Sequence, residues 1–304
     1  GGLITREDLA AYEVVRSPAL SGSYRGLRIA TNVPGGSGVQ VIEALNILEH
    51  FDLTALGHNT PEYIRTVVEA IAYAFNDKRN KVGDPAFVDV PLDQLVDKEY
   101  AKSFAAKITA GEKASLDRMT LAESKDTTHV CTLDEHGNAV TMTHTLGAPS
   151  GVIAPGTGFI MNGCMSIFDP RPGKAMSIAP GKSYTSSMSP AILFDGDSPH
   201  IVIGAPGAAY IPQAIAQAIV NAVDFRMTMT EAVAAPRIAM TKNQTVEVSN
   251  RIPQYVTNEV EAMGYGLIRN YLSYAFAGVH GIKVTSDGWQ GGADPGRDGV
   301  ALVI

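Results

Sequence analysis

The spacing of apolar residues changes near residue 127, and this change limits the folds open to the chain. Before it, apolar side chains recur mainly at helical spacing. After it, short alternating segments bounded by Gly, Asn, Asp and Ser predict strands. Further helices follow those strands. Strands gathered between flanking helices favour an α+β fold of stacked sheets covered by helices over alternating βαβ units.

Residues 1–126 are expected to be mostly helical. Thr60 at an N-cap position and Pro61 at the first helical position mark one helix start. The predicted helices span residues 39–51, 60–79 and 91–108. From 109 to 126 the periodicity is lost and the composition turns polar, which indicates a linker. The expected division is therefore a helical region, 1–126, and a second region, 127–304.

The second region is expected to begin with a hairpin, because two alternating segments flank the turn sequence Asp-Glu-His-Gly-Asn at 134–138. A strongly apolar helix is predicted at 207–225. Pro236 and Gly264 are expected to end two later helices, and a final pair of strands closes the chain.

Composition argues against several functional classes. The 304 residues include 24 Lys plus Arg and 31 Asp plus Glu, a net charge of −7 without a basic block, so neither nucleic acid nor an anionic membrane is the expected partner. No apolar run approaches ~18 residues, so no transmembrane helix is predicted. Cys131 and Cys164 cannot build a disulfide framework. The first residues show neither an initiator Met nor a signal-peptide pattern. We therefore expect the chain to start within a longer protein, and cytoplasm and periplasm both stay open.

Common motifs for metal, phosphate and serine-hydrolase chemistry are missing from the sequence: HExxH, GxxxxGK[ST], GxSxG and Cys/His clusters at metal spacing. No metal or cofactor is therefore expected. The loop 34–38 precedes a helix and could hold an anion, but an ordinary helix-start turn is favoured because no Lys-Ser or Lys-Thr follows. His144 is more simply explained as a solvated or hydrogen-bonded strand histidine than as a ligand.

The segment Asp126-Thr127-Thr128-His129 lies where the polar linker meets the first strand. A threonine hydroxyl is a weak nucleophile, but a threonine at a chain start carries its own base, the free α-amine, with a pKa near ~8. The same oxygen can expose that amine by attacking the preceding carbonyl to give an ester that water opens. Taken alone, this segment is much better explained by β-branched residues starting a strand.

Several segments together resemble the γ-glutamyltransferase family of self-processing N-terminal-nucleophile (Ntn) hydrolases. The resemblance runs in order over nearly the whole chain and covers residues 1–15, 46–53, 76–91, 126–146, 177–194, 201–210, 220–225, 231–238 and 291–299. It implies a four-layer αββα sandwich, with 1–126 similar to the later part of the large subunit and 127–304 similar to the small subunit. An upstream part of the large subunit has no counterpart in this chain.

The resemblance implies that Thr127 is the nucleophile and that the chain is cut between Asp126 and Thr127. It also implies that the hydroxyl of Thr145 hydrogen-bonds to the nucleophile. The residues agree, because a hairpin that turns at 134–138 brings residue 145 beside residue 127 at its open end. Without the resemblance, an ordinary strand threonine explains Thr145 equally well.

The resemblance further implies that Ser186 and Ser187 bind the carboxylate of the substrate. Gly207 and Ala208 match a Gly-Gly pair whose backbone N–H groups form the oxyanion hole. They lie between a predicted strand and a predicted helix, where backbone donors and the helix dipole favour negative charge. Alanine in the second position keeps the N–H, provided that its φ does not require glycine.

The chain departs from the family pattern near the expected site. Gly147 stands where the family usually has Asn. The stretch 163–167 aligns with a family segment whose Gln and Asp hold the α-amino group of the substrate, and it places Cys164 and Ile167 there instead, so the alignment still implies that Cys164 contacts the substrate. Ile167 cannot pair with an ammonium group, and a thiol poorly replaces an amide. The family's Arg for the α-carboxylate lies upstream of this chain.

The favoured hypothesis is a self-processing enzyme of the kind found in glutathione metabolism. It would hydrolyse or transfer a γ-glutamyl-type acyl group through an acyl-threonine, from a small-molecule amide to water or an amine. The first alternative is an acylase acting on a non-glutamyl amide. The second is an uncut, inactive relative with a binding or scaffold role. The resemblance implies a heterodimer of 1–126 and 127–304, and higher homo-oligomers stay open.

Overall fold

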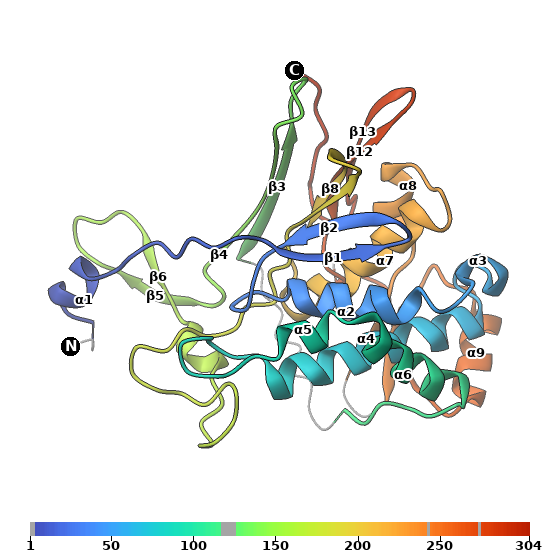
Figure 1. Cartoon of the computed structure of the whole chain (residues 1–304), viewed down its shortest axis with the longest axis horizontal. Coiled ribbons are helices and arrows are strands. Elements are labelled where there is room, and N and C mark those ends of the chain that lie inside the picture. Colours follow the sequence, from blue (N-terminus) through green and yellow to red (C-terminus); the bar gives the residue numbers. More distant parts are fainter. Residues whose placement is uncertain (1–3, 117–125, 242–243, 273–274) are drawn as a thin grey trace.

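A six-stranded antiparallel sheet forms the centre of the molecule (Figure 1). The computed structural model describes residues 4–116, 126–241, 244–272 and 275–304. The strands lie in the order β1 (Leu20–Tyr24), β2 (Leu27–Thr31), β7 (Ala191–Asp195), β8 (Ser198–Gly204), β12 (His280–Thr285) and β13 (Gly288–Ala293). The sheet therefore joins segments from both sides of residue 127.

Strands β1 and β2 lie in the first region beside its helices, and the sequence did not predict them. The sequence of β1, Leu-Ser-Gly-Ser-Tyr, has too few apolar residues to signal a strand. Both strands are stabilised by tertiary packing, since Tyr24 of β1 and Ile29 of β2 are fully buried. Gly22 also allows close approach of a helix, because a Cβ there would lie 2.7 Å from Ile42.

Helices cover one face of this sheet. Those in contact with it are α2 (Gly38–Leu48), α7 (Ile211–Val223) and α8 (Met229–Ala234), and α4 (Pro61–Lys81) and α6 (Lys98–Thr109) pack on α2. Every residue of α2 is buried, which explains why its sequence is apolar on most sides. One hydrophobic core joins these helices to the inner side chains of the sheet, including Ile201 and Ile203 of β8.

One predicted helix start is confirmed, and two other predicted helices differ from the prediction. The start at Thr60 is confirmed, since its hydroxyl accepts the N–H of Tyr63. The predicted helix 91–108 divides into α5 (Leu92–Leu95) and α6, because Asp97 caps a new helix by accepting the N–H of Tyr100 at 2.7 Å. The predicted helix 207–225 opens as a short 3-10 turn before α7 begins at Ile211.

The predicted hairpin is confirmed as β3 (Thr127–Leu133) and β4 (Ala139–Thr145). It packs on the face of the large sheet opposite the helices, because the open side of Gly204 in β8 faces His129 whereas Ile203 points into the helical core. The described residues thus stack helices, sheet and hairpin, and the expected α+β class is confirmed.

Smaller elements complete the fold. They are α1 (Arg6–Ala10), α3 (Leu53–Leu56), β5 (Pro149–Ile153), β6 (Ile160–Asn162), β9 (Ile238–Met240), β10 (Thr245–Ser249), α9 (Gln254–Ala262) and β11 (Gly266–Asn270). Strands β9 to β11 form a separate three-stranded sheet. Among the described residues, no helix combines the length and apolar character needed to cross a membrane.

Half of the predicted linker, at 117–125, lies outside the described residues. Its first part packs firmly, since the N–H of Ala114 donates to buried Glu69 at 2.6 Å and Leu116 is 4% exposed. Asp126, on the far side, is exposed next to the start of β3.

Candidate active site

Thr127 and Thr145 face each other at the open end of the hairpin. They are directly opposite in the strand register, and their Oγ1 atoms lie 2.7 Å apart. Both side chains are half-buried on the hairpin face that meets the large sheet. The structure therefore brings together the two threonines that the sequence singled out, at hydrogen-bond distance.

The turn after β4 completes a short hydrogen-bond series. The N–H of Gly147 donates to Thr145 Oγ1 at 2.8 Å. Gly147 has a φ of 66°, a conformation that glycine adopts without steric cost. With this donor in place, the Thr145 oxygen keeps a set direction toward Thr127.

Gly147 and Cys164, two of the positions that depart from the family pattern, are neighbours in the structure. A Cβ at Gly147 would lie 2.4 Å from the sulfur of Cys164, so the thiol occupies the space that any side chain at 147 would need. The Cys164 thiol donates to the carbonyl of Leu146 at 3.3 Å and is 3% exposed. Its direct contact with a substrate stays a prediction.

Tyr184 is a site residue that the sequence analysis did not identify. Burial raises the pKa of its phenol, and the nearby thiol of Cys164 raises it further. No motif marked Tyr184, because only folding brings it beside Cys164.

The serine loop is held by the loop 34–38. The N–H of Ser186 donates to Gly35 O at 2.8 Å, and the Ser37 hydroxyl donates to Ser186 O at 2.7 Å. Ser186 and Ser187 are half-buried.

The start of helix α2 is an ordinary turn. The N–H of Ser37 donates to Met188 O at 2.9 Å, and that of Gly38 donates to the side chain of Asn32 at 3.1 Å. Both N–H donors already have protein partners, so an ordinary helix start is favoured over an anion-binding site.

Gly207 and Ala208 form a tight turn after β8. Gly207 has a φ of 139°, and a Cβ there would lie 2.5 Å from Ala277, so both conformation and space require glycine. Ala208 has a φ of 52°, in the left-handed region that is unfavourable for alanine. The hairpin approaches this turn, because His129 packs on Gly204 and Thr127 is the next residue on the same face of β3.

Replacing Ala208 with glycine is expected to raise the free energy of unfolding by about 1 kcal/mol. Glycine accepts a positive φ without the contact between Cβ and backbone that alanine suffers. Thermal and denaturant unfolding of both proteins measure this change. A lower free energy of unfolding for the glycine variant would contradict a left-handed conformation at residue 208.

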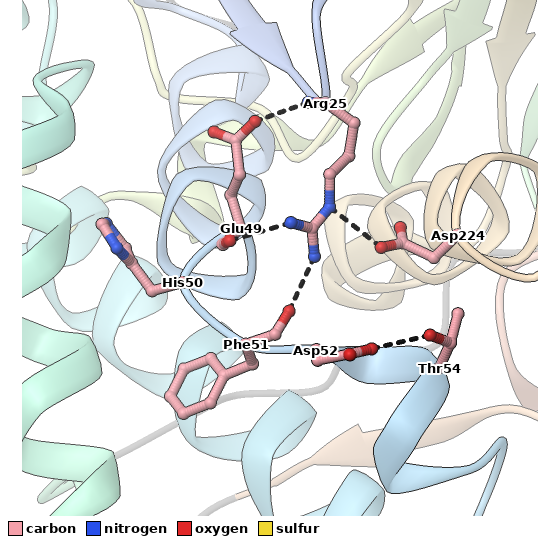
Figure 2. Close-up of a pocket in the computed structure, with 7 residues that line it drawn as sticks. All are labelled: Arg25, Glu49, His50, Phe51, Asp52, Thr54 and Asp224. Carbon is pink, nitrogen blue, oxygen red and sulfur yellow. Dashed lines mark hydrogen bonds and ion pairs between the residues drawn. The ribbon is translucent and has the colours of Figure 1, made fainter.

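A separate pocket lies at the end of helix α2 (Figure 2). Figure 2 shows the Arg25 guanidinium donating to the carbonyls of Glu49 and Phe51 and pairing with Asp224. Arg25 is therefore engaged in joining the β1–β2 turn to two helix ends. None of the pocket's lining residues belongs to the hairpin or the serine loop, and we assign it a structural role.

Within the described parts of the chain, no three His, Cys, Asp or Glu side chains are grouped to hold a metal ion.

Comparison with known proteins gives consistent matches. The sequence model for Gamma-glutamyltranspeptidase matches residues 1–304. The Acylase ACY 1 proenzyme of Pseudomonas sp. (strain V22) is 39% identical over 309 residues, covering 100% of this chain and 55% of the relative. The Glutathione hydrolase proenzyme of Escherichia coli (strain K12) is 37% identical over 255 residues, covering 78% and 44%.

A solved structure agrees in fold. The cephalosporin acylase from Bacillus halodurans superposes with a TM-score of 0.87 at 29% identity, over 98% of this chain and 55% of that chain. The chain thus spans about half the length of the curated relatives it matches. The fold class expected from the sequence is confirmed by this likeness.

Proposed function

Because the chain belongs to the γ-glutamyltranspeptidase family, we propose that it forms the catalytic part of an amide hydrolase or acyltransferase that attacks through Thr127 Oγ1. The observation that carries this proposal is the 2.7 Å contact between the hydroxyls of Thr127 and Thr145. It occurs at the first residue of a strand that follows a polar linker, where an N-terminal nucleophile would be released.

The first step is self-cleavage. Thr127 Oγ1 attacks the carbonyl carbon of Asp126, the C–N bond breaks, and the proton of the hydroxyl ends on the released amine. The resulting ester joins Asp126 to the Thr127 side chain. Water then hydrolyses this ester, which leaves a carboxylate on Asp126 and a free α-amine on Thr127.

In turnover, the α-amine takes the proton of the Thr127 hydroxyl while Oγ1 attacks the amide carbonyl of the substrate. The backbone N–H groups of Gly207 and Ala208 stabilise the oxyanion that forms. The leaving amine departs with the proton, and the acyl-threonine is resolved by water or by an acceptor amine. Thr145 orients the nucleophile throughout.

The two products of cleavage are proposed to stay together as a heterodimer. Strands β1 and β2 come from 1–126, yet β2 pairs with β7 of the second piece through four residue pairs from Arg28↔Phe194 to Thr31↔Ala191. Helices of both pieces also share one core. Separation would expose that apolar surface to water, which is strongly unfavourable.

Mass spectrometry of the purified protein tests self-cleavage. We expect two species under denaturing conditions, with a new N-terminus at Thr127 in the second, and one particle under native conditions. A chain that remains intact after prolonged incubation would contradict the proposal and support the alternative of an uncut binding or scaffold protein.

The acyl group is proposed to be one without a charged α-amine. Ile167 is 43% exposed, and its Cδ1 lies 3.8 Å from the position of a Cβ at Gly147, so an apolar side chain lies beside the turn that follows Thr145. An ammonium group placed there would lose water without gaining an ion pair. This favours an acylase over a strict γ-glutamyl enzyme, and Ser186 and Ser187 would still bind a distal carboxylate, as in a glutaryl group.

Wild-type protein is therefore expected to hydrolyse a glutaryl anilide at least as well as the matched γ-glutamyl anilide. Ile167→Asp is expected to shift the ratio of their kcat/KM values toward the γ-glutamyl compound by roughly tenfold, because the new carboxylate supplies a partner for the ammonium group. Met165→Asp, on the same turn but 64% exposed, is the control and should leave the ratio unchanged. A strong wild-type preference for the γ-glutamyl anilide would contradict this assignment.

A further inference from the structure

A row of polar side chains separates the hairpin from the large sheet, and His129 is at its centre. Of its residues, His129 is 7% exposed, and Cys131, Thr141 and Thr143 lie beside it on the same face of the hairpin. A polar group in such a layer is costly unless each donor and acceptor has a partner. The hydrogen-bond partners of His129 therefore identify the strands that this layer connects.

The hydrogen bonds around His129 fit one tautomer of its ring, in which Cys131 Sγ, 3.2 Å from Nε2, is a second acceptor. Thr141 donates its proton to the carbonyl of Ile203 at 3.0 Å, so its oxygen is left to accept from His129 Nε2 at 3.2 Å. With Nε2 protonated, Nδ1 is an acceptor for the Thr143 hydroxyl at 2.9 Å. The network thus assigns a neutral Nε2–H imidazole that links β4 to the backbone of β8.

The His129 ring also packs directly on β8. A Cβ at Gly204 would lie 2.1 Å from His129 Cε1 and 2.5 Å from Nε2, so only glycine leaves room for the ring. Gly204 is the last residue of β8 and comes three residues before Gly207. His129 in turn is two residues after Thr127, on the same face of β3. The ring therefore lies between the strand that begins with Thr127 and the strand that leads to Gly207. The distance between these two strands sets the distance from the nucleophile to the proposed oxyanion hole.

We infer that His129 is a positioning residue that sets the distance between Thr127 Oγ1 and the backbone donors of the Gly207 turn. It acts through two fixed contacts, the hydrogen-bond series to Ile203 O and the packing of its ring on Gly204. This inference rests on the proposed function. Burial lowers the pKa of His129 to about 4, consistent with a neutral ring that takes no part in proton transfer. His280 is the titratable group on the neighbouring strand β12 that lowers it further.

Two substitutions disturb these contacts from opposite sides. Gly204→Ala keeps every hydrogen-bonding group and displaces the ring, whereas His129→Phe keeps a ring and removes the hydrogen bonds. Each is expected to lower kcat by roughly 10- to 100-fold with KM changed less than threefold, since a displacement near 1 Å is enough for such a loss. The double variant should lose little more than either single one, because both act on one contact. His129→Gln, which offers one donor and one acceptor, should regain part of kcat.

The controls separate positioning from stability. His144→Gln makes the same change on the exposed face of the same hairpin and should retain wild-type kcat. Val260→Ala removes buried volume in helix α9, far along the chain from the site, and reports the effect of destabilisation alone. If Gly204→Ala and His129→Phe keep kcat within twofold, or lose it only in proportion to unfolded protein as Val260→Ala does, the inference is overturned.

A measurement on wild-type protein is independent of activity. Nitrogen-15 spectra of labelled histidine are expected to show one neutral Nε2–H ring with no titration between pH 5 and 8. A His129 that titrates near 6.5, or carries its proton on Nδ1, would overturn the inference even if the variants do not fold. Wild-type protein that neither cleaves itself nor turns over amides, while showing this spectrum, would instead contradict the proposed function.

Discussion

Thr127→Ala is expected to remain a single uncut chain and to lose amide turnover by a factor of about 10⁴ to 10⁶. The change removes Oγ1, the atom that is proposed to attack both the Asp126 carbonyl and the substrate. The partner hydroxyl, Thr145 Oγ1, lies 2.7 Å from that atom in a strand pairing that alanine also tolerates, so the fold should be preserved. Intact mass and the hydrolysis of glutaryl and γ-glutamyl anilides measure the two effects.

Thr128→Ala is the matched control for this experiment. Thr128 is the next residue, is exposed, and points to the other face of the hairpin. It should be cut and active. Thr127→Ser keeps the oxygen and is expected to be cut and to retain measurable turnover. An active, cut Thr127→Ala protein would assign the nucleophile to another residue.

Gly207→Ala is expected to lower turnover by about 10² to 10³ in the protein that folds. Alanine at a φ of 139° is strained, and its Cβ would overlap Ala277 at 2.5 Å, so the turn must move its N–H groups away from the oxyanion position. The free energy of unfolding should also fall, by about 1–3 kcal/mol. Single-turnover acylation kinetics and thermal unfolding measure these effects separately.

Gly196→Ala separates the strain of a positive φ from the loss of the oxyanion donors. Gly196 has a φ of 57° in the β7–β8 turn, and its Cβ would meet nothing within 4 Å. That variant should lose about 1 kcal/mol of stability and keep its turnover. Normal acylation by a folded Gly207→Ala protein would show that this turn does not stabilise the oxyanion.

The part of the site that rests on local pattern could be predicted from the sequence. The hairpin is an example, because alternation and a Gly-Asn turn specify both strands and their register. That register alone places Thr145 opposite Thr127. Likewise, the N-cap at Thr60 is satisfied by a group three residues away and needs no tertiary partner.

Features that depend on distant residues could not be predicted. Strands β1 and β2 have weak patterns and are stabilised by burial of Tyr24 and Ile29. The departure at Gly147 could be noted in the sequence, but its match to the Cys164 thiol appears only when the two segments pack. Tyr184 had no signal at all, since its proximity to Cys164 depends on the packing of two segments.

The sequence by itself determined the hairpin, its register and most helix starts, because these follow from interactions among residues near one another along the chain. The candidate nucleophile came from the family resemblance. Only the tertiary structure decided that His129 packs on Gly204 and that the Gly207 turn cannot accommodate a side chain. Those facts depend on how closely the backbones of separate elements approach. Such distances are set by the packing of the whole core, to which every side chain contributes and which no local pattern encodes.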